Sequence, residues 1–410
     1  MITDDQWIGQ IYQQQSRRVL STLIRLLGDF SLAEECMQEA FAAAVRQWPV
    51  DGIPDNPAAW LIRTGQRRGI DQIRKAQTAR SYSHLVAEPE TDDPETDEET
   101  INDDQLRLLF TCCHPALSLD ARIALTLREM CGLTTEQVAS GLLQKPATLA
   151  QRIVRAKRKI RDAGIPYEVP EAKELPERLP GVLRVIYLVF NEGYSRSDGD
   201  QVVDVQLSSE AIRLAEVLAR LLPDGEVFGL LALMLLQRSR DKARQDAGGN
   251  LITLENQDRS LWDRASIDSG FRWLEAALDR TPTGPYTLQA SIAAVHADAD
   301  TPGETDWARI VRLYNALYQQ QPSPVIALNR AVAVAMRDSP AVGLEMLETL
   351  MGQRAMAGYH LFHAARADLQ RRSGHTEDAR QSYQRALALV SQGPERRFLE
   401  RRLAELEKSP

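Results

Sequence analysis

The amino-acid sequence predicts an all-α protein built from two small helical domains, an acidic linker and a longer domain of helical repeats. Apolar residues recur at helical spacing through most of the chain, and stretches containing Pro or Gly interrupt them. The C-terminal part repeats a small-and-large apolar pattern at a period of about 34 residues. With 410 residues, the chain is too long for one ordinary core, so several domains are expected.

The composition excludes several classes of protein. A hydrophobic fraction of 43% and a charged fraction of 26% are typical of soluble globular proteins. The longest apolar run, Val227 to Leu236, is too short to span a bilayer. The N-terminus lacks the basic start and apolar core of a signal peptide, and four Cys without an export signal indicate a reducing compartment. We therefore expect a cytoplasmic protein with no membrane partner.

Residues 5–77 are predicted to form the first helical domain. Gly28 and Asp29 end the first helix. Ser31 is expected to cap a second helix, with Glu34 three residues later in the spacing of a capping box, and this helix should run to about Trp48. Pro49 to Pro57 should form a loop, because three Pro and a Gly lie within it.

The second helix carries three polar residues on one face. They are spaced i, i+3 and i+4, opposite a side predicted to be apolar. The polar residues are Glu35, Gln38 and Glu39, and the apolar ones are Met37, Phe41 and Val45. Alone, such a polar face is more often simply solvated than used in binding.

A third helix is predicted from about Ala58 to Lys75, and it interleaves five bases with Trp60. Aromatic platforms beside basic side chains suit unstacked single-stranded DNA. Taken alone, Trp60 is more typical of a core residue. Gly65 and Gly69 are expected to soften this helix, each costing about 1 kcal/mol relative to Ala.

Residues 78–104 are predicted to be an acidic linker. Between 88 and 104 there are ten acids and no base. A segment with so little to bury is expected to stay disordered or extended.

Residues 105–166 should form a compact helical unit that ends at Gly164 and Pro166. Ten bases and four acids give it a charge of +6, in a chain whose formal net charge is −8. Within it, residues 133–161 have the pattern of a helix-turn-helix, whose second helix enters the DNA major groove. Thr134 should cap the first helix, with Gln137 three residues on.

The second helix of this motif should expose a polar stripe and bury an apolar one. The exposed stripe is Thr148, Gln151, Arg152 and Arg155, and the inward residues are Leu149, Ile153 and Ala156. Gln pairs naturally with adenine, and Arg with guanine or phosphate. The plainer interpretation is a solvated basic helix, or one that binds an acidic protein.

The run Cys112-Cys113-His114 invites a metal interpretation, but neighbouring side chains on a helix diverge by about 100°. We expect core packing there and no metal. Cys131 is likewise expected to be buried.

Residues 175–405 are predicted to be helical with short loops. Residues 246–254, centred on Gly248 and Gly249, should form a small hairpin or ordered loop. The polar segments 190–194 and 255–264 could form a ligand pocket or docking surface, although a buried polar network is favoured. The sequence shows neither a nucleophile–base pair nor a phosphate-binding glycine loop, so we predict a protein that is not an enzyme and has no cofactor.

Taken together, these segments resemble bacterial sigma factors of the extracytoplasmic-function (ECF) type, which keep the second and fourth conserved regions. The resemblance lies in residues 28–41, 56–71 and 133–161. Segments 110–117, 187–194 and 322–335 resemble one subgroup, which carries a large C-terminal domain of tetratricopeptide (TPR) type. One departure is Ala150, where many sigma factors place an Arg that faces DNA.

The resemblance implies roles for specific residues. The partners it implies are promoter DNA and core RNA polymerase, through its β′ clamp helices and β flap. Docking on the clamp helices would use Glu35, Gln38 and Glu39. The loop 51–57 would capture a flipped base of the −10 element, whose contacts would be Asp55, Asn56, Trp60, Arg63, Arg67 and Arg68. The −35 element would be contacted by Lys145, Thr148, Gln151, Arg152, Arg155, Lys157 and Arg158.

The expected function is therefore to direct core polymerase to promoters, with the C-terminal domain modulating activity in cis through an intramolecular or protein partner. Two other classes stay open from the sequence. One is a helix-turn-helix regulator with a TPR sensor that does not engage polymerase, and the other is a scaffold whose basic helix binds acidic proteins.

Overall fold

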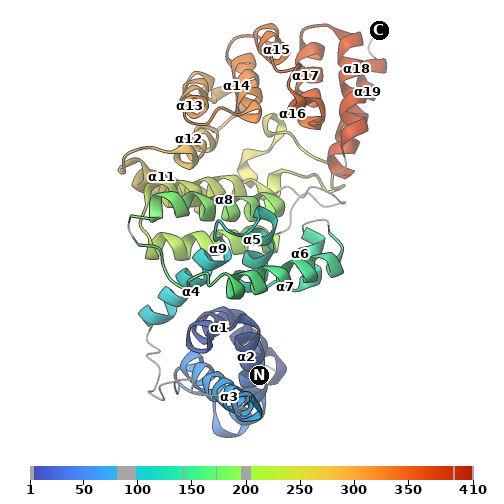
Figure 1. Cartoon of the computed structure of the whole chain (residues 1–410). Helices are drawn as coiled ribbons and strands as arrows, with labels where there is room; N and C mark the ends of the chain where they lie inside the picture. Colours follow the sequence, from blue (N-terminus) through green and yellow to red (C-terminus); the bar gives the residue numbers. More distant parts are fainter. Residues whose placement is uncertain are drawn as a thin grey trace. The chain divides into compact units, whose positions relative to one another are not determined.

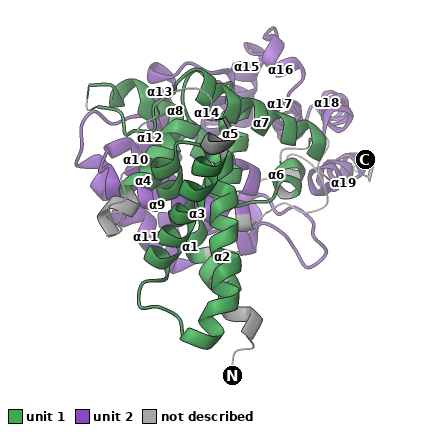
Figure 2. Cartoon of the chain, turned by 60° about the horizontal axis from the view of Figure 1, so that its bottom comes forward, with its two compact units in different colours: residues 1–188 green, residues 189–410 purple. Residues whose placement is uncertain are grey.

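The computed structural model describes residues 4–80, 98–141, 144–171, 173–194, 205–390 and 393–408. The chain divides into two compact units, Met1–Leu188 and Val189–Pro410 (Figure 2). Across the described residues the regular structure is helical apart from one isolated antiparallel bridge between Gln245 and Leu251. This confirms the all-α prediction. Among these helices, none combines the length and apolar character that crossing a membrane requires.

The first three helices pack against one another in unit 1 (Figure 1). They are α1 (Asp4–Leu27), α2 (Phe30–Asp51) and α3 (Pro57–Arg80). Their shared core includes fully buried Leu23, Met37 and Leu61. As predicted, α1 ends before Gly28, whose positive φ of 69° suits Gly better than any other residue.

The start of α2 differs from the prediction. Asp29, not Ser31, is its N-cap, and the Asp29 carboxylate accepts hydrogen bonds from the backbone N–H groups of Ser31 and Leu32 at 2.8 and 2.9 Å. The predicted capping box of Ser31 and Glu34 therefore does not form. The helix also continues past Trp48 to Asp51 with Pro49 inside it. The exposed Val45 lies one turn before Pro49, so water can replace the lost bond to its carbonyl.

The two glycines of α3 have a packing role that the sequence did not reveal. A Cβ at Gly65 would lie 2.7 Å from Leu23 Cδ1, and one at Gly69 would lie 2.5 Å from Leu27 Cδ2. Both glycines therefore let α1 approach α3 closely, which offsets their poor helix propensity.

The predicted acidic linker is shorter than expected. Its last seven residues are helical, because α4 spans Glu98–Cys112 and packs on α1. Asp104 is fully buried and accepts hydrogen bonds from Arg25 and Arg107, both at 2.8 Å. The prediction failed because composition alone does not show that two bases are available to pair with this acid. Residues 81–97 lie outside the described residues.

A second group of helices in unit 1 comprises α5 (Leu119–Leu125), a π-helical turn (Thr126–Met130), α6 (Thr135–Gly141) and α7 (Pro146–Asp162). Of these, α6 and α7 are the two helices of the predicted helix-turn-helix. Leu149, Ile153 and Ala156 are buried, which confirms the predicted inner face of α7. Cys112, Cys113 and Cys131 are also buried, as expected for core packing.

Unit 2 continues the helical pattern, and the boundary between the units falls inside α8 (Leu175–Tyr194). Helix α10 (Gly225–Arg238) carries the longest apolar run, which is entirely buried. It packs against α9 (Val205–Leu221), α11 (Arg264–Leu278) and α12 (Pro285–Asp298). The loop at 246–250 is ordered by the Asp246 carboxylate, which accepts bonds from the N–H groups of Gly248 and Asn250, each at 2.9 Å.

The remaining helices are coloured orange to red in Figure 1. They are α13 (Trp307–Gln320), α14 (Pro324–Arg337), α15 (Pro340–Glu348), α16 (Arg354–Ala357), α17 (His360–Arg372), α18 (Thr376–Leu389) and α19 (Gly393–Lys408). Each packs on the next along the chain, except that α15 packs on α17, with the short α16 between them in sequence. Their apolar residues form three neighbouring core clusters. Gly343 of α15 lies against α14, where a Cβ would meet that of Ala335 at 2.4 Å.

Candidate nucleic-acid interface

Helix α7 presents the candidate DNA-contacting surface. Thr148, Gln151 and Arg155 are exposed and line a groove of about 360 Å³ between α7 and α5, together with Lys159. Arg158 is also exposed, on the neighbouring side of the helix. Thr148, Gln151 and Arg155 form the exposed stripe predicted from the sequence, because the buried Leu149 and Ile153 fix the opposite side of α7 in the core, whereas Arg152, also predicted to be exposed, is half-buried. A basic helix with Gln and Thr beside it has the donors and acceptors that base edges and phosphates require.

Two other residues predicted to contact DNA lie at the edge of this surface. Lys145 is the exposed N-cap residue of α7. Arg152 is half-buried and donates to the Gln144 side-chain oxygen at 2.7 Å, while its guanidinium lies 3.6 Å from the Asp120 carboxylate. These contacts fix the direction in which the Arg152 side chain extends.

Lys157 does not share the exposed stripe. Its side chain is 13% exposed, and its ammonium lies 3.1 Å from the Glu34 carboxylate and 3.0 Å from that of Glu129. Burial lowers the pKa of Lys157, but the two carboxylates outweigh it and raise that pKa above its ordinary value. In this conformation Lys157 forms structural ion pairs with Glu34 and Glu129.

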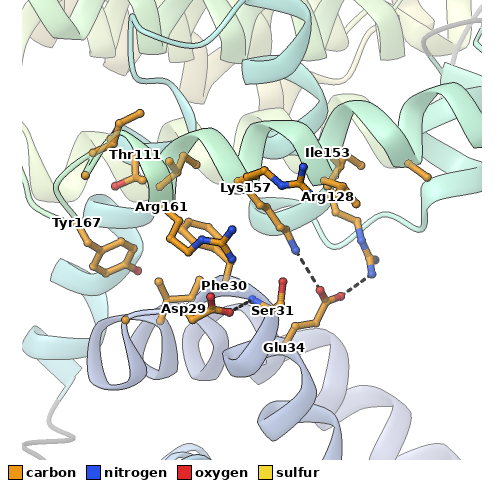
Figure 3. A pocket seen from close by; sticks show the side chains of 18 of the residues that line it. Asp29, Phe30, Ser31, Glu34, Thr111, Arg128, Ile153, Lys157, Arg161 and Tyr167 are labelled. Atoms are coloured by element: carbon orange, nitrogen blue, oxygen red, sulfur yellow. Dashed lines mark hydrogen bonds and ion pairs between the residues drawn. The ribbon is translucent and has the colours of Figure 1, made fainter. Parts of the chain in front are cut away.

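Glu34 connects the first three helices to the helix-turn-helix. Besides Lys157, it binds the Arg128 guanidinium at 2.6 Å (Figure 3). Burial raises the pKa of Glu34, yet Lys157 and Arg128 together lower that pKa below its usual value. We call the set Glu34, Arg128, Glu129 and Lys157 the clasp.

A cavity of about 600 Å³ lies beside the clasp, between the start of α2 and α7 (Figure 3). Phe30 and Ser31 line it from α2, and Ile153 and Arg161 from α7. At its other end the Tyr167 hydroxyl donates to the carbonyl oxygens of Ser21 and Asp104, at 2.8 and 3.0 Å. The two helical parts of unit 1 thus meet through ionic and hydrogen-bonded contacts around an incompletely filled space.

The three polar residues of α2 lie on the surface as predicted. Glu35 and Gln38 are exposed, and Glu39 lies 3.8 Å from the guanidinium of Arg68 on α3. Val45 was predicted to be inward but is 50% exposed. Steps of four residues turn a helix by 400°, so Val45 has drifted about 80° from Met37 toward solvent.

The turn between α2 and α3 brings the remaining predicted residues to one end of the bundle. Asp55 is exposed, and the Asn56 side-chain oxygen accepts from the backbone N–H of Ala59 at 3.0 Å, capping α3. Trp60 is half-buried and packs edge to face on Trp48, with ring centroids 5.2 Å apart. It is therefore partly a core residue and partly available to a ligand.

The basic side chains of α3 continue from this end. Arg63, Arg67 and Arg68 are exposed, and they lie three, seven and eight residues after Trp60 on the helix. An aromatic ring at the start of a basic track has the character of a single-strand-binding surface. The structure thus brings Asp55, Asn56, Trp60 and these arginines onto neighbouring parts of one helix and its preceding turn.

Three family models match parts of this chain. Sigma-70 region 2 matches residues 11–79, and sigma-70 region 4 matches residues 107–160. A "Probable ECF RNA polymerase sigma factor SigI" of Mycobacterium tuberculosis is 30% identical over 187 residues, 44% of this chain and 60% of that protein. The chain is an ECF sigma factor. A further match, to a family of unknown function (DUF6596), covers residues 178–278.

Other relatives extend the comparison. An uncharacterized protein of Rhizobium meliloti is 42% identical over 416 residues, which is 100% of this chain and 98% of that protein. An "ECF RNA polymerase sigma factor SigK" of Mycolicibacterium vanbaalenii is 27% identical over 164 residues, 38% of this chain and 82% of that protein. The architecture with a long C-terminal extension is therefore shared by a full-length relative.

Membership of this family decides among the three functional classes that the sequence left open. Sigma regions 2 and 4 imply binding of core RNA polymerase and of promoter DNA, and sigma factors are not enzymes. The function is therefore promoter recognition by RNA polymerase. A regulator that never engages polymerase, or a scaffold without DNA affinity, does not account for both sigma regions.

Proposed function

We propose that this sigma factor docks on the clamp helices of the polymerase β′ subunit through Glu35, Gln38 and Glu39. The support is their position, since they lie on the outer side of α2, away from its buried residues. Acidic side chains on such a face complement a basic partner helix. The protein would act in the bacterial cytoplasm.

The end of the bundle formed by Asp55, Asn56 and Trp60 would bind the melted −10 strand. A base flipped out of the duplex needs a pocket and a stacking surface, and the half-exposed Trp60 offers one. Arg63, Arg67 and Arg68 would follow the phosphates of that strand.

The observation that carries most weight is the exposed stripe of α7. Thr148, Gln151 and Arg155 would contact the edges of −35 bases, while Lys145, Arg152 and Arg158 would contact phosphates. Region 4 would also contact the β flap. Lys157, which the sequence placed among the DNA contacts, would instead hold the clasp.

Promoter binding would require region 2 and region 4 to separate. Elements named −10 and −35 lie about 25 base pairs apart, which is roughly 85 Å of duplex at about 3.4 Å per base pair. In the structure, Glu34 of region 2 lies 3.1 Å from Lys157 on the DNA-contacting helix. The conformation with a closed clasp would therefore be the free form of the protein.

The C-terminal domain would modulate this activity in cis. Its successive helix pairs and three core clusters support a TPR-like arrangement, in which stacked hairpins present a long surface to a partner. Comparing the full chain with residues 1–170 tests its role, since a cut after Pro170 keeps the Tyr167 contacts. Identical transcription by both, in vitro and in cells, would contradict a modulating role.

The decisive experiment for the proposed function is transcription in vitro with core polymerase, the full chain and genomic fragments from upstream of its own gene. Defined transcripts are expected with the wild type, and their loss with Glu35→Lys. The matched control is Glu255→Lys, the same charge change at an exposed position of unit 2. If Glu35→Lys and the control transcribe equally, α2 is not the polymerase-docking face.

The DNA-contacting stripe is tested separately. Arg155→Ala should weaken transcription from promoters with an intact −35 element and lower the salt dependence of DNA binding. Lys173→Ala removes an equal charge from an exposed residue outside α7 and should leave both unchanged. Equal behaviour of these two variants would exclude α7 from −35 recognition.

A further inference from the structure

Three arginines of unit 2 gather around two aromatic rings. Arg240 donates to the Tyr194 hydroxyl at 2.8 Å, and the guanidinium carbon of Arg244 lies 3.8 Å from the centroid of the same ring. Arg240 and Arg259 share the ring of Trp262, at 5.9 and 5.0 Å. Segments 190–194 and 255–264, which the sequence suggested for a polar site, thus meet at these side chains.

These arginines are removed from water. Arg244 is 8% exposed and Arg259 is 7% exposed, and Arg240 is half-buried. Burial lowers the pKa of Arg244, and burial with the neighbouring Arg240 charge lowers the pKa of Arg259. Burial and the charges of Arg240 and Arg259 also lower the pKa of His296 to about 4, so His296 is neutral at pH 7.

Within the described residues, none of these three arginines has an ion pair. Asp241 and Glu395 act on Arg244 through space without forming an ion pair, and burial raises the pKa of Asp241 to about 6, despite the opposing charges of Arg244 and Arg238. One of its carboxylate oxygens is buried without a hydrogen-bond partner. Buried charges in proteins are normally paired, because an uncompensated one is costly.

Arg259 has a structural explanation that does not extend to the other two. Its guanidinium donates to the carbonyl oxygens of His296 and Ala299 and to the Thr305 hydroxyl, which fixes the segment after α12. Arg240, in contrast, donates in the described structure to the Tyr194 hydroxyl, and Arg244 to the Tyr194 carbonyl oxygen. Each guanidinium has five N–H groups, so most donors of these two remain for another acceptor.

We propose that Arg240 and Arg244, which meet at Tyr194, bind the phosphate group of a small molecule in the C-terminal domain. Phosphate fits better than a carboxylate because it carries nearly two charges and three acceptor oxygens, which two guanidiniums can share. The charge of Arg259 adds to the attraction from across Trp262. Arg240 is less buried than Arg244 and Arg259, so a ligand would approach the site from its side.

The test is thermal melting of the full-length protein with inorganic phosphate, and in a second series with ribose 5-phosphate, at constant ionic strength set by chloride. A saturable rise in melting temperature of about 2–4 °C is expected at about five times the dissociation constant. Tighter binding of ribose 5-phosphate would identify the natural ligand as a phosphorylated small molecule, and equal binding would identify free phosphate.

Variants separate this site from the DNA-contacting helix, which also attracts phosphate. Arg240→Met should abolish the rise, whereas Arg272→Met, at an exposed position of α11, and the double variant Arg155→Ala/Arg158→Ala should keep it. Tyr194→Phe, which removes one hydroxyl and no charge, serves if Arg240→Met fails to fold, and it should raise the dissociation constant several-fold. A rise that is absent in the wild type, or lost only in the α7 double variant, would overturn the proposal.

Discussion

Asp29 caps the start of α2, whereas the sequence predicted Ser31 for this role. We expect Asp29→Ala to destabilise region 2 by about 1 kcal/mol, because two backbone N–H groups lose their acceptor. Ser31→Ala, two residues later on an exposed position, should change stability little. Thermal melting and amide hydrogen exchange in the first turn of α2 measure both. Equal losses in the two variants would show that Ser31 shares the cap.

The buried thiols of unit 1 give a prediction about pH. Burial raises the pKa of Cys113 to about 11, against a smaller opposing effect of its hydrogen bond to Thr126, and it raises the pKa of Cys112 well above its ordinary value. The folded state therefore favours the neutral thiols. Their contribution to stability is complete below about pH 8.5, the ordinary thiol pKa, and is lost as the pH rises toward 11.

The corresponding measurement is alkylation followed by mass spectrometry. At pH 8, iodoacetamide should leave Cys112 and Cys113 unmodified in the native protein and modify both in denaturant, because the thiolate is the nucleophile. Rapid modification of either thiol without unfolding would show that this part of the core opens to solvent.

At the scale of single helices, spacing in the sequence predicted most of what the structure shows. The buried face of α7 and the break at Gly28 follow from apolar periodicity and from Gly itself. The start of α4 could not be predicted, because burial of Asp104 depends on Arg25, which lies 79 residues earlier. The paired role of Lys157 was missed for the same reason, since Glu34 is 123 residues away.

Glycines inside helices also depend on contacts with distant segments, which the sequence alone does not show. Their helix propensity argues against Gly65 and Gly69, and only the approach of α1 explains them. Gly343 of α15 is the clearest case, because a Cβ there would lie 2.8 Å from the carbonyl oxygen of Ala331, a backbone atom that cannot turn away. The propensity gained by Ala, about 1 kcal/mol, is therefore smaller than the strain it introduces.

We accordingly expect Gly343→Ala to destabilise the C-terminal unit by about 1–3 kcal/mol, even though Ala is the better helix former. Gly352→Ala is the matched control, because a Cβ at Gly352 meets nothing within 4 Å. Thermal melting of both full-length variants distinguishes them. A stabilised Gly343→Ala protein would show that α14 and α15 can separate without cost.

At the scale of the whole chain, we propose that the clasp holds unit 1 in a closed state before polymerase binds. Glu35 and Gln38, which we propose dock on polymerase, and the α7 stripe all stay exposed while the clasp is closed. The closed form can therefore meet either partner, but it cannot span both promoter elements. Opening then becomes a step that promoter binding has to drive, and the cost of breaking the clasp is subtracted from the affinity for the promoter.

Reversing the charge of Glu34 should open the clasp. Glu34→Lys places a cation beside Arg128 and Lys157, so we expect the loss of about 2 kcal/mol from contacts that are only partly shielded from solvent. Energy transfer between dyes on region 2 and region 4 of the full chain should report a longer distance. The double variant Glu34→Lys/Arg128→Glu should recover part of the closed state, because it restores one pair of opposite charges and leaves Lys157 beside Glu129.

Glu35→Lys provides the matched control for this change. It alters the same charge on the next residue, but Glu35 is exposed and lies outside the clasp, so the dye distance should stay short while polymerase binding is lost. A pH titration of the dye distance is a second control. Because the pKa of Glu34 is lowered, we expect the clasp to stay closed as the pH falls through the ordinary titration range of Glu and to open only below that range. If Glu34→Lys and Glu35→Lys gave the same distance, another contact, such as that of Tyr167 with Ser21 and Asp104, would be the one that holds the two regions together.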